Sequence, residues 1–452
     1  MGPALAVGDV NNDGLDDFYV GGAQDQPGSL FIQLANGEFI QKENEVFKQF
    51  SKAEDIVAHF SDFNGDGNLD LYVGSGGNEH PSGALFNFDR LFFGSGNGDF
   101  QFIPMALPHE GENTSSIAIH DIDGDGDLDI FVGSSVVSGD YGASPKSSLL
   151  INQGNGIYLD KTQEWFGVEA ELGMINSAIW ADLTGNGKRE LILTGDWQGI
   201  RIFENTDGKS LQEKAFNGLE YSSGWIQSLV VADINQDGRM DILTGNLGMN
   251  SKLKATQQNP IWLYHGDFDK NGQADPLIFH SMGERLVPFA TRDDLIKQIP
   301  GIKKKHNSYL SYSSITKPED LFTAEILGNI SKKPIYEFRS GAYLQHEDGS
   351  FAFIPFPDEA QLSPILSVSW DEEKSTVLLG GNFSGFRVDL GINITSAFRS
   401  FQWEKNTWTK KDLPTSIKPK SEIRNIQKIM VNGTTFGLVA SNSGPLYWIK
   451  LD

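Results

Sequence analysis

The sequence predicts an all-β protein: a seven-bladed β-propeller of four-stranded blades with a small helical insertion. An acidic loop recurs along the chain, with first aspartates at Asp9, Asp62, Asp121, Asp182 and Asp233, so the repeat is 51 to 61 residues long. Regular self-similarity of this length indicates that one supersecondary unit is copied, as in a propeller blade. Between the loops lie short apolar runs separated by Gly and Asn turns, which are typical of antiparallel strands.

Each repeat unit shows the same order of elements. An apolar strand leads into the acidic loop, a second apolar strand ending in glycine follows, and a third strand such as 29–34 or 148–152 comes next. A Gly/Asn turn and a fourth strand complete the unit, so we expect an up-and-down antiparallel sheet. Two later segments, 365–381 and 426–440, keep this strand pattern without the acidic loop. Added to the five earlier units, they give the seven expected blades.

The acidic loops follow the pattern D-x-[DN]-x-[DN]-G-x-x-D. Calcium takes roughly six to eight oxygen ligands, and this spacing lets side chains at alternate positions converge on one ion while a glycine makes the sharp turn. We therefore predict Ca²⁺ in about five loops, with the backbone carbonyl at position 7 as a further ligand. The predicted metal-binding residues are Asp9, Asn11, Asp13, Leu15, Asp17, Asp62, Asn64, Asp66, Asn68, Asp70, Asp121, Asp123, Asp125, Asp127, Asp129, Asp233, Asn235, Asp237, Arg239, Asp241, Asp267, Asp269, Asn271, Gln273 and Asp275.

Two other interpretations of the loops are weaker. An EF-hand shares the first six positions but needs a glutamate at position 12 and flanking helices. Position 12 is instead Val20, Val73, Val132, Thr244 or Ile278, and the residues after each loop have strand character. Ordinary turns also use Asp, Asn and Gly. They do not need carboxylates at fixed alternate positions, however, and such carboxylates repel one another without a cation.

One loop keeps the frame but loses most of the acidic groups. The loop from Asp182 has Thr184 at position 3, Lys188 at position 7 and Glu190 at position 9. Its oxygen charge is much lower than that of the other loops. We therefore expect a turn without metal there.

The loop from Asp267 breaks the period, because it begins only 34 residues after Asp233. We place it in a later hairpin of the fifth blade, between the apolar runs 261–264 and 276–279. On this interpretation the loop decorates an existing blade and does not start a new one.

Residues 282–334 depart from the strand pattern. Thr291–Asp294 is typical of a capping box and predicts a short helix that ends before Pro300, and Pro318 suits the first turn of a second helix. No Pro/Ser-rich linker divides the chain. We therefore expect a single propeller domain over residues 1–452 with an inserted helical excursion at about 282–334, lying over one face.

Composition limits the class of partner. The formal net charge is −24 at pH 7, and the chain contains no cysteine. Nucleic acid is excluded as a partner because phosphate binding needs a basic surface, and disulfides and thiolate metal sites are excluded as well. Calcium loops of this kind are loaded where calcium is abundant, so we expect an extracellular, outer-surface or periplasmic monomer.

The chain shows no signal peptide and no apolar run long enough to span a membrane. Its start, Met1–Pro3, leads directly into a strand, so we expect a fragment of a longer secreted chain. The last predicted blade ends at Trp448–Asp452 and would then lack its closing fourth strand.

The repeated acidic loop, followed by a strand and a glycine, resembles the FG-GAP or VCBS repeat of integrin α-chain propellers and of many bacterial surface proteins. A closer resemblance is to bacterial proteins of the cartilage acidic protein type. It rests on the acidic loop at Gly266–Pro276, the following stretch Ala290–Gln298 and the lysines at 303–305. This resemblance implies a secreted or outer-surface protein, and calcium roles carry over only to positions that match the loop.

No motif for catalysis stands out: the eight histidines are scattered, and neither a Gly-x-Ser-x-Gly elbow nor a phosphate loop is present. We assign no catalytic residue. The candidate ligand-binding residues are Trp262, Arg292, Tyr309 and Tyr312, in or next to the insertion, where they either stack on sugar rings or dock the insertion. We expect a non-enzymatic binding or scaffold module for a protein or polysaccharide at the cell surface. The alternative is a carbohydrate-active enzyme, such as a polysaccharide lyase, with structural calcium.

Overall fold

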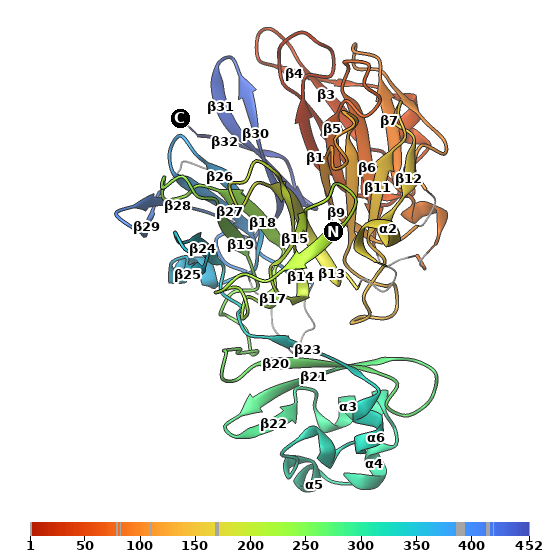
Figure 1. The fold of residues 1–452 in the computed structure, drawn as a ribbon, viewed down its shortest axis with the longest axis vertical. Coiled ribbons are helices and arrows are strands. Elements are labelled where there is room, and N and C mark those ends of the chain that lie inside the picture. Colours follow the sequence, from red (N-terminus) through yellow and green to blue (C-terminus); the bar gives the residue numbers. More distant parts are fainter. Residues whose placement is uncertain are drawn as a thin grey trace.

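The computed structural model consists mainly of antiparallel β-sheets joined by short loops (Figure 1). Within the residues that it describes, no helix is long and apolar enough to cross a membrane. The predicted all-β class is confirmed. The described residues are 2–77, 80–81, 83–108, 111–167, 171–385, 394–412, 416–418 and 420–451.

Sheets 1 to 3 follow one another along the chain, and each has four strands. Sheet 1 contains β1 (Leu5–Gly8), β2 (Asp17–Val20), β3 (Ser29–Gln33) and β4 (Phe39–Lys42). Sheet 2 contains β5 (Glu54–Ser61), β6 (Asp70–Gly76), β7 (Arg90–Gly94) and β8 (Phe100–Phe102). Sheet 3 contains β9 (Thr114–His120), β10 (Asp129–Ser134), β11 (Ser148–Asn152) and β12 (Tyr158–Asp160).

Sheets 4 to 7 continue the series. Sheet 4 contains β13 (Met174–Ala181), β14 (Glu190–Gln198), β15 (Arg201–Asn205) and β16 (Leu211–Lys214), with β17 (Gly224–Trp225) paired to β14. Sheet 5 contains β18 (Ser228–Ala232), β19 (Asp241–Gly245), β24 (Gly341–Gln345) and β25 (Phe351–Pro355). Sheet 6 contains β26 (Ile365–Asp371), β27 (Thr376–Gly381), β28 (Phe398–Glu404) and β29 (Thr407–Lys410). Sheet 7 contains β30 (Glu422–Val431), β31 (Thr434–Asn442) and β32 (Tyr447–Lys450).

The first strands of these sheets form a closed ring. They contact one another in the order β1, β5, β9, β13, β18, β26 and β30, and β30 contacts β1 again. Within each of these seven sheets the strands pair in chain order, apart from the additional β17 of sheet 4, so the first strand is innermost and the others lie progressively outward. Sheets arranged radially around one axis in this way define a β-propeller.

Sheet 7 closes the ring against sheet 1. The Met430 backbone N–H donates to Asp16 Oδ2 at 2.8 Å, and Gln33 Nε2 donates to the Met430 carbonyl at 3.0 Å. Trp448 on β32 packs against the rings of Phe18 and Phe39, with centroids 6.0 and 5.2 Å apart. Hydrogen bonds and aromatic packing therefore join the two sheets that are most distant along the chain.

The second strand of a sheet is buried on both faces, because a neighbouring sheet packs on each side. Every residue of β6 and of β10 is buried. This explains the continuous apolar runs such as Ile130–Val132, because a strand with one face in solvent would alternate apolar and polar residues. Between sheets 1 and 2, Tyr19 and Phe92 both pack on Phe47, at ring-centroid distances of 5.3 and 5.4 Å.

The insertion is larger than predicted and has a sheet of its own. The Asp267 loop lies in this inserted sheet and not in a hairpin of the fifth blade, which corrects the prediction. The insertion therefore extends beyond the expected 282–334, and the fifth sheet resumes only at β24. The inserted sheet has the order β22-β21-β20-β23 and contains β20 (Ile261–Gly266), β21 (Asp275–Met282), β22 (Arg285–Pro288) and β23 (Ser331–Ile335).

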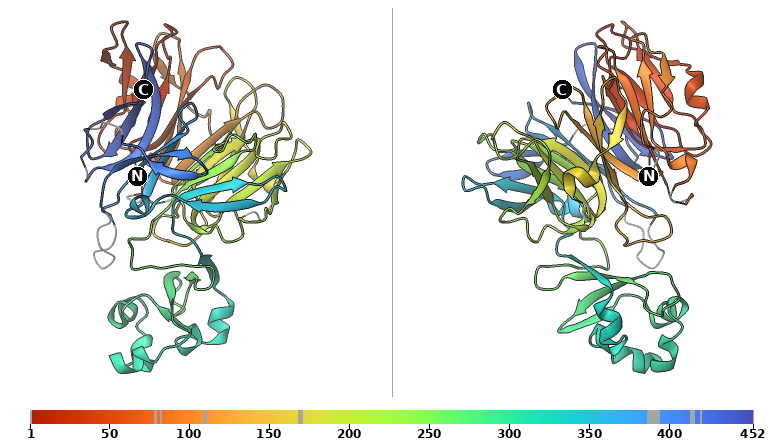
Figure 2. Two further views of the ribbon diagram at one scale, coloured as in Figure 1. Left: turned by 90° about the vertical axis from the view of Figure 1, so that its left-hand side faces the viewer. Right: turned by 45° about the vertical axis from the view of Figure 1, so that its right-hand side comes forward.

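Short helices pack beside this inserted sheet, and the whole insertion projects from one end of the ring (Figures 1 and 2). The first predicted helix is present, and the Thr291 hydroxyl caps it by accepting from the Asp294 N–H at 3.3 Å. The second is divided into a 3₁₀ turn at Pro318–Asp320 and a separate α6. The α-helices are α1 (Glu45–Lys48), α2 (Thr162–Phe166), α3 (Arg292–Gln298), α4 (Ile302–Lys305), α5 (Tyr309–Ser313) and α6 (Ala324–Gly328), and further 3₁₀ turns span Leu85–Asn87 and Asp358–Gln361.

A buried ion pair within sheet 2 is also hydrogen-bonded to sheet 1. Arg90 Nη2 donates to Asp55 Oδ1 at 2.7 Å, and the two side chains are 6% and 3% exposed. The other oxygen of Asp55 accepts from the Tyr19 hydroxyl and from the Gly22 N–H, both at 2.8 Å. Asp55 thus holds residues of three strands and one loop together.

We expect Asp55→Ala to lower the free energy of unfolding by about 3–5 kcal/mol, because Arg90 would remain buried without its counter-charge. Urea unfolding followed by tryptophan fluorescence measures this loss. Glu45→Ala, at the exposed Glu45–Lys48 pair, is the control and should cost at most about 1 kcal/mol. A loss in Asp55→Ala no larger than that of the control would contradict the prediction.

Candidate metal loops and the insertion surface

The acidic loops of the ring connect the first strand of a sheet to the second. The loop from Asp62 joins β5 to β6, and the loop from Asp121 joins β9 to β10. Neighbouring loops contact each other, since Asn12 Nδ2 donates to Asn68 Oδ1 at 2.9 Å. The loops therefore gather on one face of the propeller. The insertion leaves sheet 5 from the far end of β19 and stands on the opposite face.

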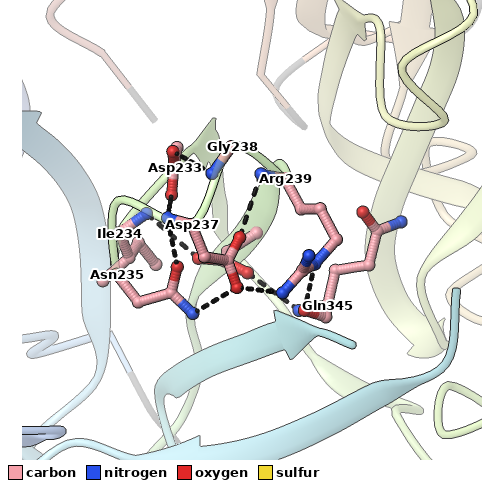
Figure 3. Close-up of polar contacts among 8 residues, drawn as sticks. Asp233, Ile234, Asn235, Asp237, Gly238, Arg239 and Gln345 are labelled. Carbon is pink, nitrogen blue, oxygen red and sulfur yellow. Dashed lines mark hydrogen bonds and ion pairs between the residues drawn. The ribbon is translucent and has the colours of Figure 1, made fainter. Parts of the chain in front are cut away.

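The first aspartate of each loop holds the turn. In the Asp233 loop, Oδ1 accepts from the Asp237 N–H at 3.0 Å and Oδ2 from the Gly238 N–H at 2.8 Å (Figure 3). The same two bonds in the Asp9 loop measure 3.1 and 2.7 Å. Gly238 has φ +85°, a conformation that favours glycine over residues with a Cβ. The motif glycine is therefore required by the backbone.

The aspartate at position 9 connects its loop to the third strand of the sheet. Asp129 Oδ2 accepts from the Ile122 N–H at 2.9 Å, and Oδ1 accepts from the Asn152 N–H at 2.8 Å. Both oxygens of this carboxylate are thus bound by backbone donors on two separate segments. Sequence reasoning treated position 9 as a metal ligand alone and missed this structural role. The same arrangement occurs at Asp17, Asp70 and Asp241.

In sheets 3, 4 and 5 an amide side chain then connects the sheet to the loop of the preceding sheet. Asn152 Nδ2 donates to the Phe63 carbonyl at 2.9 Å. Asn205 Nδ2 reaches the Ile122 carbonyl at 2.8 Å, and Gln345 Nε2 reaches the Leu183 carbonyl at 3.2 Å. The accepting carbonyl is always that of position 2 of the previous loop. The loops are therefore linked from blade to blade.

Burial makes the position 9 carboxylates costly to ionise. It raises the pKa of Asp17 and of Asp241 to about 6, and the pKa of Asp70 and of Asp129 to about 7, from an ordinary value of 3.8. Neighbouring loop carboxylates raise these pKa values further, while the backbone N–H bonds lower them. A bound cation would favour the ionised form and offset this cost.

Two loops bring three carboxylates together. The first group consists of Asp121, Asp123 and Asp129, and the second of Asp267, Asp269 and Asp275. In each group, one carboxylate oxygen from each residue lies within 4.8 Å of the other two. In the second group, Asp269 Oδ1 and Asp275 Oδ2 are buried and have no hydrogen-bond partner among the described residues. Anionic oxygens in this state match the donor set of a hard divalent cation.

The loops with asparagine at position 3 use its amide internally. Nδ2 of Asn11, Asn64 and Asn235 donates to the position 5 aspartate at 3.0, 3.2 and 3.0 Å. In the Asp233 loop the Arg239 guanidinium also forms an ion pair with the position 5 carboxylate (Figure 3). This loop thus carries its own positive charge beside the predicted ligands. Position 7 residues donate their backbone N–H to the position 5 side chain; they are Leu15, Asn68, Asp127, Arg239 and Gln273.

The Asp182 loop retains the same backbone geometry with different side chains. Asp182 Oδ2 accepts from the Gly187 N–H at 2.9 Å. Glu190 replaces the position 9 aspartate, since its Oε2 accepts from the Leu183 N–H at 2.8 Å and its Oε1 from the Thr184 hydroxyl at 3.0 Å. The position 9 contact to the loop is thus preserved where the other acidic groups are lost.

Three of the four candidate ligand-binding residues lie together in the insertion. The Arg292 guanidinium stacks over the Tyr309 ring at 5.6 Å, and the Tyr309 hydroxyl donates to Asp293 Oδ2 at 2.7 Å. Tyr312 donates to the Ala290 carbonyl at 2.8 Å and packs into the core of the insertion. These contacts dock the helices to one another. Tyr309 nevertheless remains 60% exposed.

Trp262 lies on β20, apart from that group. It pairs with Phe279 on β21 and with Pro334 on β23, and it packs against the core of the insertion. Its place within the inserted sheet indicates a packing role.

Comparison with known proteins supports the repeat. A profile described as FG-GAP-like repeat matches residues 9–73, 62–132 and 182–244. Each match begins at the first aspartate of one loop and ends at position 12 of the next, and the third begins at the altered Asp182 loop. The chain therefore carries FG-GAP-like repeats on a β-propeller, and the combination suggests a binding or scaffold module. The finer resemblance to integrins and to the cartilage acidic protein type stays a prediction.

None of the curated proteins matches the chain. Among solved structures, an Agrocybe aegerita lectin that recognises non-reducing terminal N-acetylglucosamine is 15% identical, with coverage of 64% of this chain and 77% of that chain and a TM-score of 0.37. YCF48 bound to D1 peptide is 9% identical, with coverage of 100% and 93% and a TM-score of 0.44. The Dos1 propeller is 11% identical, with coverage of 83% and 64% and a TM-score of 0.36. Likenesses this distant carry no argument about ligand or activity.

We expect Asn152→Ala to lower the free energy of unfolding by about 1–3 kcal/mol, because the buried Phe63 carbonyl would lose its donor. Chemical denaturation measures the loss. Asn97→Ala, in the exposed turn between β7 and β8, is the matched control and should change stability by less than about 0.5 kcal/mol. Equal stability of the Asn152 variant and the wild type would show that the blade-to-blade amide contributes nothing.

We expect the metal-free protein to lose stability as the pH rises from about 4 to about 7. The folded pKa values of Asp17, Asp70, Asp129 and Asp241 lie above their unfolded values. Folding therefore favours the protonated carboxyls, and their contribution is present below pH 4 and lost as the pH passes through 6 to 7. Melting temperatures in EDTA across this range measure the effect, and Asp129→Asn should reduce the slope. A melting temperature that rises with pH over this window would contradict the prediction.

Proposed function

We propose that the protein is a calcium-binding β-propeller that serves outside the cytosol as a non-enzymatic binding or scaffold module for a protein or glycan. The calcium part of the proposal rests on the Asp267 loop, in which buried oxygens of Asp269 and Asp275 have no hydrogen-bond partner among the described residues. Buried charges in proteins are paired or coordinate metals. Because these groups are all oxygen ligands on a loop, a hard cation such as Ca²⁺ is favoured over zinc or copper.

The Asp121 loop supports the same cation through charge. Three carboxylates meet in the Asp121 loop, and burial and neighbouring Asp125 raise the pKa of Asp123. A divalent cation removes the repulsion among these groups and leaves the backbone bonds of position 9 in place. Its proposed role is to stabilise the turn at the start of the second strand, so calcium would act through the fold and not in chemistry.

The division of the molecule into two faces supports a binding role. The acidic loops of the ring lie on one face, whereas the insertion projects from the ring (Figure 2) and contains the Asp267 loop. A partner at the insertion would therefore meet a surface that is separate from the ring loops and shares only the proposed Asp267 site. Loops with affinities suited to extracellular calcium would be loaded outside the cell, which is why we place the protein there.

We expect excess EDTA to lower the melting temperature by several degrees and added Ca²⁺ to restore it, because a ligand that binds only the folded state stabilises it by mass action. Differential scanning fluorimetry measures the shift, and elemental analysis of the dialysed protein counts the metal. Unchanged melting in EDTA together with no bound calcium would refute the proposal.

Variants of single loops sharpen this test. Asp269→Asn should reduce bound calcium by about one ion per chain, because it removes one of three convergent carboxylates. Asp348→Asn is the matched control, since Asp348 is an exposed turn residue that accepts from Ser350 outside any acidic loop. Equal calcium content in the two variants would remove the Asp267 loop from the set of metal sites.

A further inference from the structure

A cavity of about 510 Å³ opens on the face of the propeller that is opposite the acidic loops. Its position follows from the elements that line it: Gln227 precedes β18, Leu247 follows β19, Leu366 begins β26 and Arg424 lies near the start of β30. These points are all at the ends of strands remote from the loops. Ile278 of the inserted sheet forms another part of the wall. The volume falls within the roughly 300–1,000 Å³ range of small-ligand sites.

A fixed carboxylate lies in the cavity wall. Asp196 Oδ1 accepts from Asn176 Nδ2 at 2.8 Å and from Gln227 Nε2 at 2.9 Å. Its Oδ2 accepts from the Tyr141 hydroxyl at 3.4 Å, which is long for an O–H···O bond. The Tyr141 oxygen is itself held by Trp197 Nε1 at 2.8 Å. The carboxylate is therefore oriented by amide donors while one oxygen keeps capacity for a further donor.

Two lining residues carry donors without partners. Trp225 Nε1 and Arg424 Nε are buried and make no hydrogen bond within the described residues. Arg424 Nη2 is bound by Glu422 at 3.1 Å, and the guanidinium lies over the Phe383 ring at 5.3 Å, so the group is held in place. Buried polar groups in proteins are normally paired. The cavity is thus lined by two residues whose buried donors have no partner among the described residues, and by a carboxylate with spare acceptor capacity.

The rest of the wall is apolar and aromatic. Tyr141, Trp225 and Phe383 contribute rings, and Leu247, Ile278 and Leu366 contribute aliphatic side chains. A ligand that fits this wall needs apolar faces for the rings and edge groups that both donate and accept. A pyranose ring has this character, because its C–H faces are apolar and each hydroxyl is at once donor and acceptor.

We propose that this cavity binds a neutral sugar residue of a glycan, with Asp196 and Gln227 accepting from its hydroxyls, the Arg424 guanidinium donating to them, and the aromatic rings, including that of Trp225, packing on its faces. This inference rests on the proposed function as a binding module and specifies its ligand. An acidic sugar is disfavoured, because Asp196 would repel its carboxylate and Glu422 already partly neutralises Arg424. Sequence reasoning missed the site because its residues come from five sheets and no motif links them.

The test uses the calcium-supplemented full chain and isothermal titration with neutral hexasaccharides of glucose, xylose, mannose and N-acetylglucosamine, with oligogalacturonate as the acidic probe. We expect at least one neutral oligosaccharide to bind and oligogalacturonate to bind more weakly. Asp196→Asn should weaken binding by about tenfold or more, since a hydrogen bond to a charged acceptor is lost. Phe383→Ala is a second cavity variant and should also weaken binding, because it removes one of the rings proposed to pack on the sugar; the Phe383 side chain is only partly buried.

Asp348→Asn, in an exposed turn away from the cavity, is the matched control and should bind as the wild type does. The proposal would be overturned if no neutral probe bound, or if oligogalacturonate bound more tightly than the neutral probes. It would also be overturned if both cavity variants kept the wild-type affinity and melting temperature. Calcium content and melting in EDTA, measured on the same samples, separate the two hypotheses. A protein that is loaded and stabilised by calcium but binds no sugar would refute the sugar site alone, whereas one that neither binds nor needs calcium would refute the proposed function.

Discussion

The propeller depends on the carboxylate at the start of the second strand of its loop-bearing sheets. This group is buried, yet it accepts N–H bonds from its own loop and from the third strand, as Asp129 does from Ile122 and Asn152. Asn152 in turn donates its side chain to the Phe63 carbonyl in the preceding loop. One polar residue pair thus fixes the turn, the sheet and the neighbouring blade. Because the carboxylate is also placed beside the other acidic positions, the architecture and the proposed metal site cannot be separated.

The sequence allowed the repeat, the loop positions and the Thr291 cap to be predicted, because each depends on residues within a few positions of one another. It did not allow the inserted sheet to be recognised. The runs at 261–264 and 276–279 have strand character, but the strand that completes their pairing, Ser331–Ile335, contains two lysines and a proline and lies beyond the helices. Pairing over such a distance leaves no local pattern. For the same reason the cavity residues, such as Asp196 and Arg424, could not be assembled from sequence.

The two faces of the ring have different chemistry. The loop face is acidic, and its carboxylates accept hydrogen bonds from the backbone N–H groups of the turns. These side chains therefore serve to stabilise the fold. The opposite face includes Trp225 Nε1 and Arg424 Nε, which have no hydrogen-bond partner in the part of the chain that the structure describes, and it is bordered by the insertion. Repetition explains this contrast. The loop motif recurs from blade to blade because it makes the same turn in each one. The opposite ends of the strands differ in sequence and can therefore form one specific site.

The contact between sheets 1 and 7 governs the order in which the chain can fold. Asp16 and Met430, which meet there, are 414 residues apart. Pairings over such separations form slowly because the loop-closure entropy must be overcome before they contribute. During synthesis, sheet 1 must therefore wait for almost the entire chain, with the apolar side chains of Phe18 and Phe39 uncovered until Trp448 arrives. The N-terminal sheet therefore completes its packing against a neighbour on both sides only when the last sheet has been made.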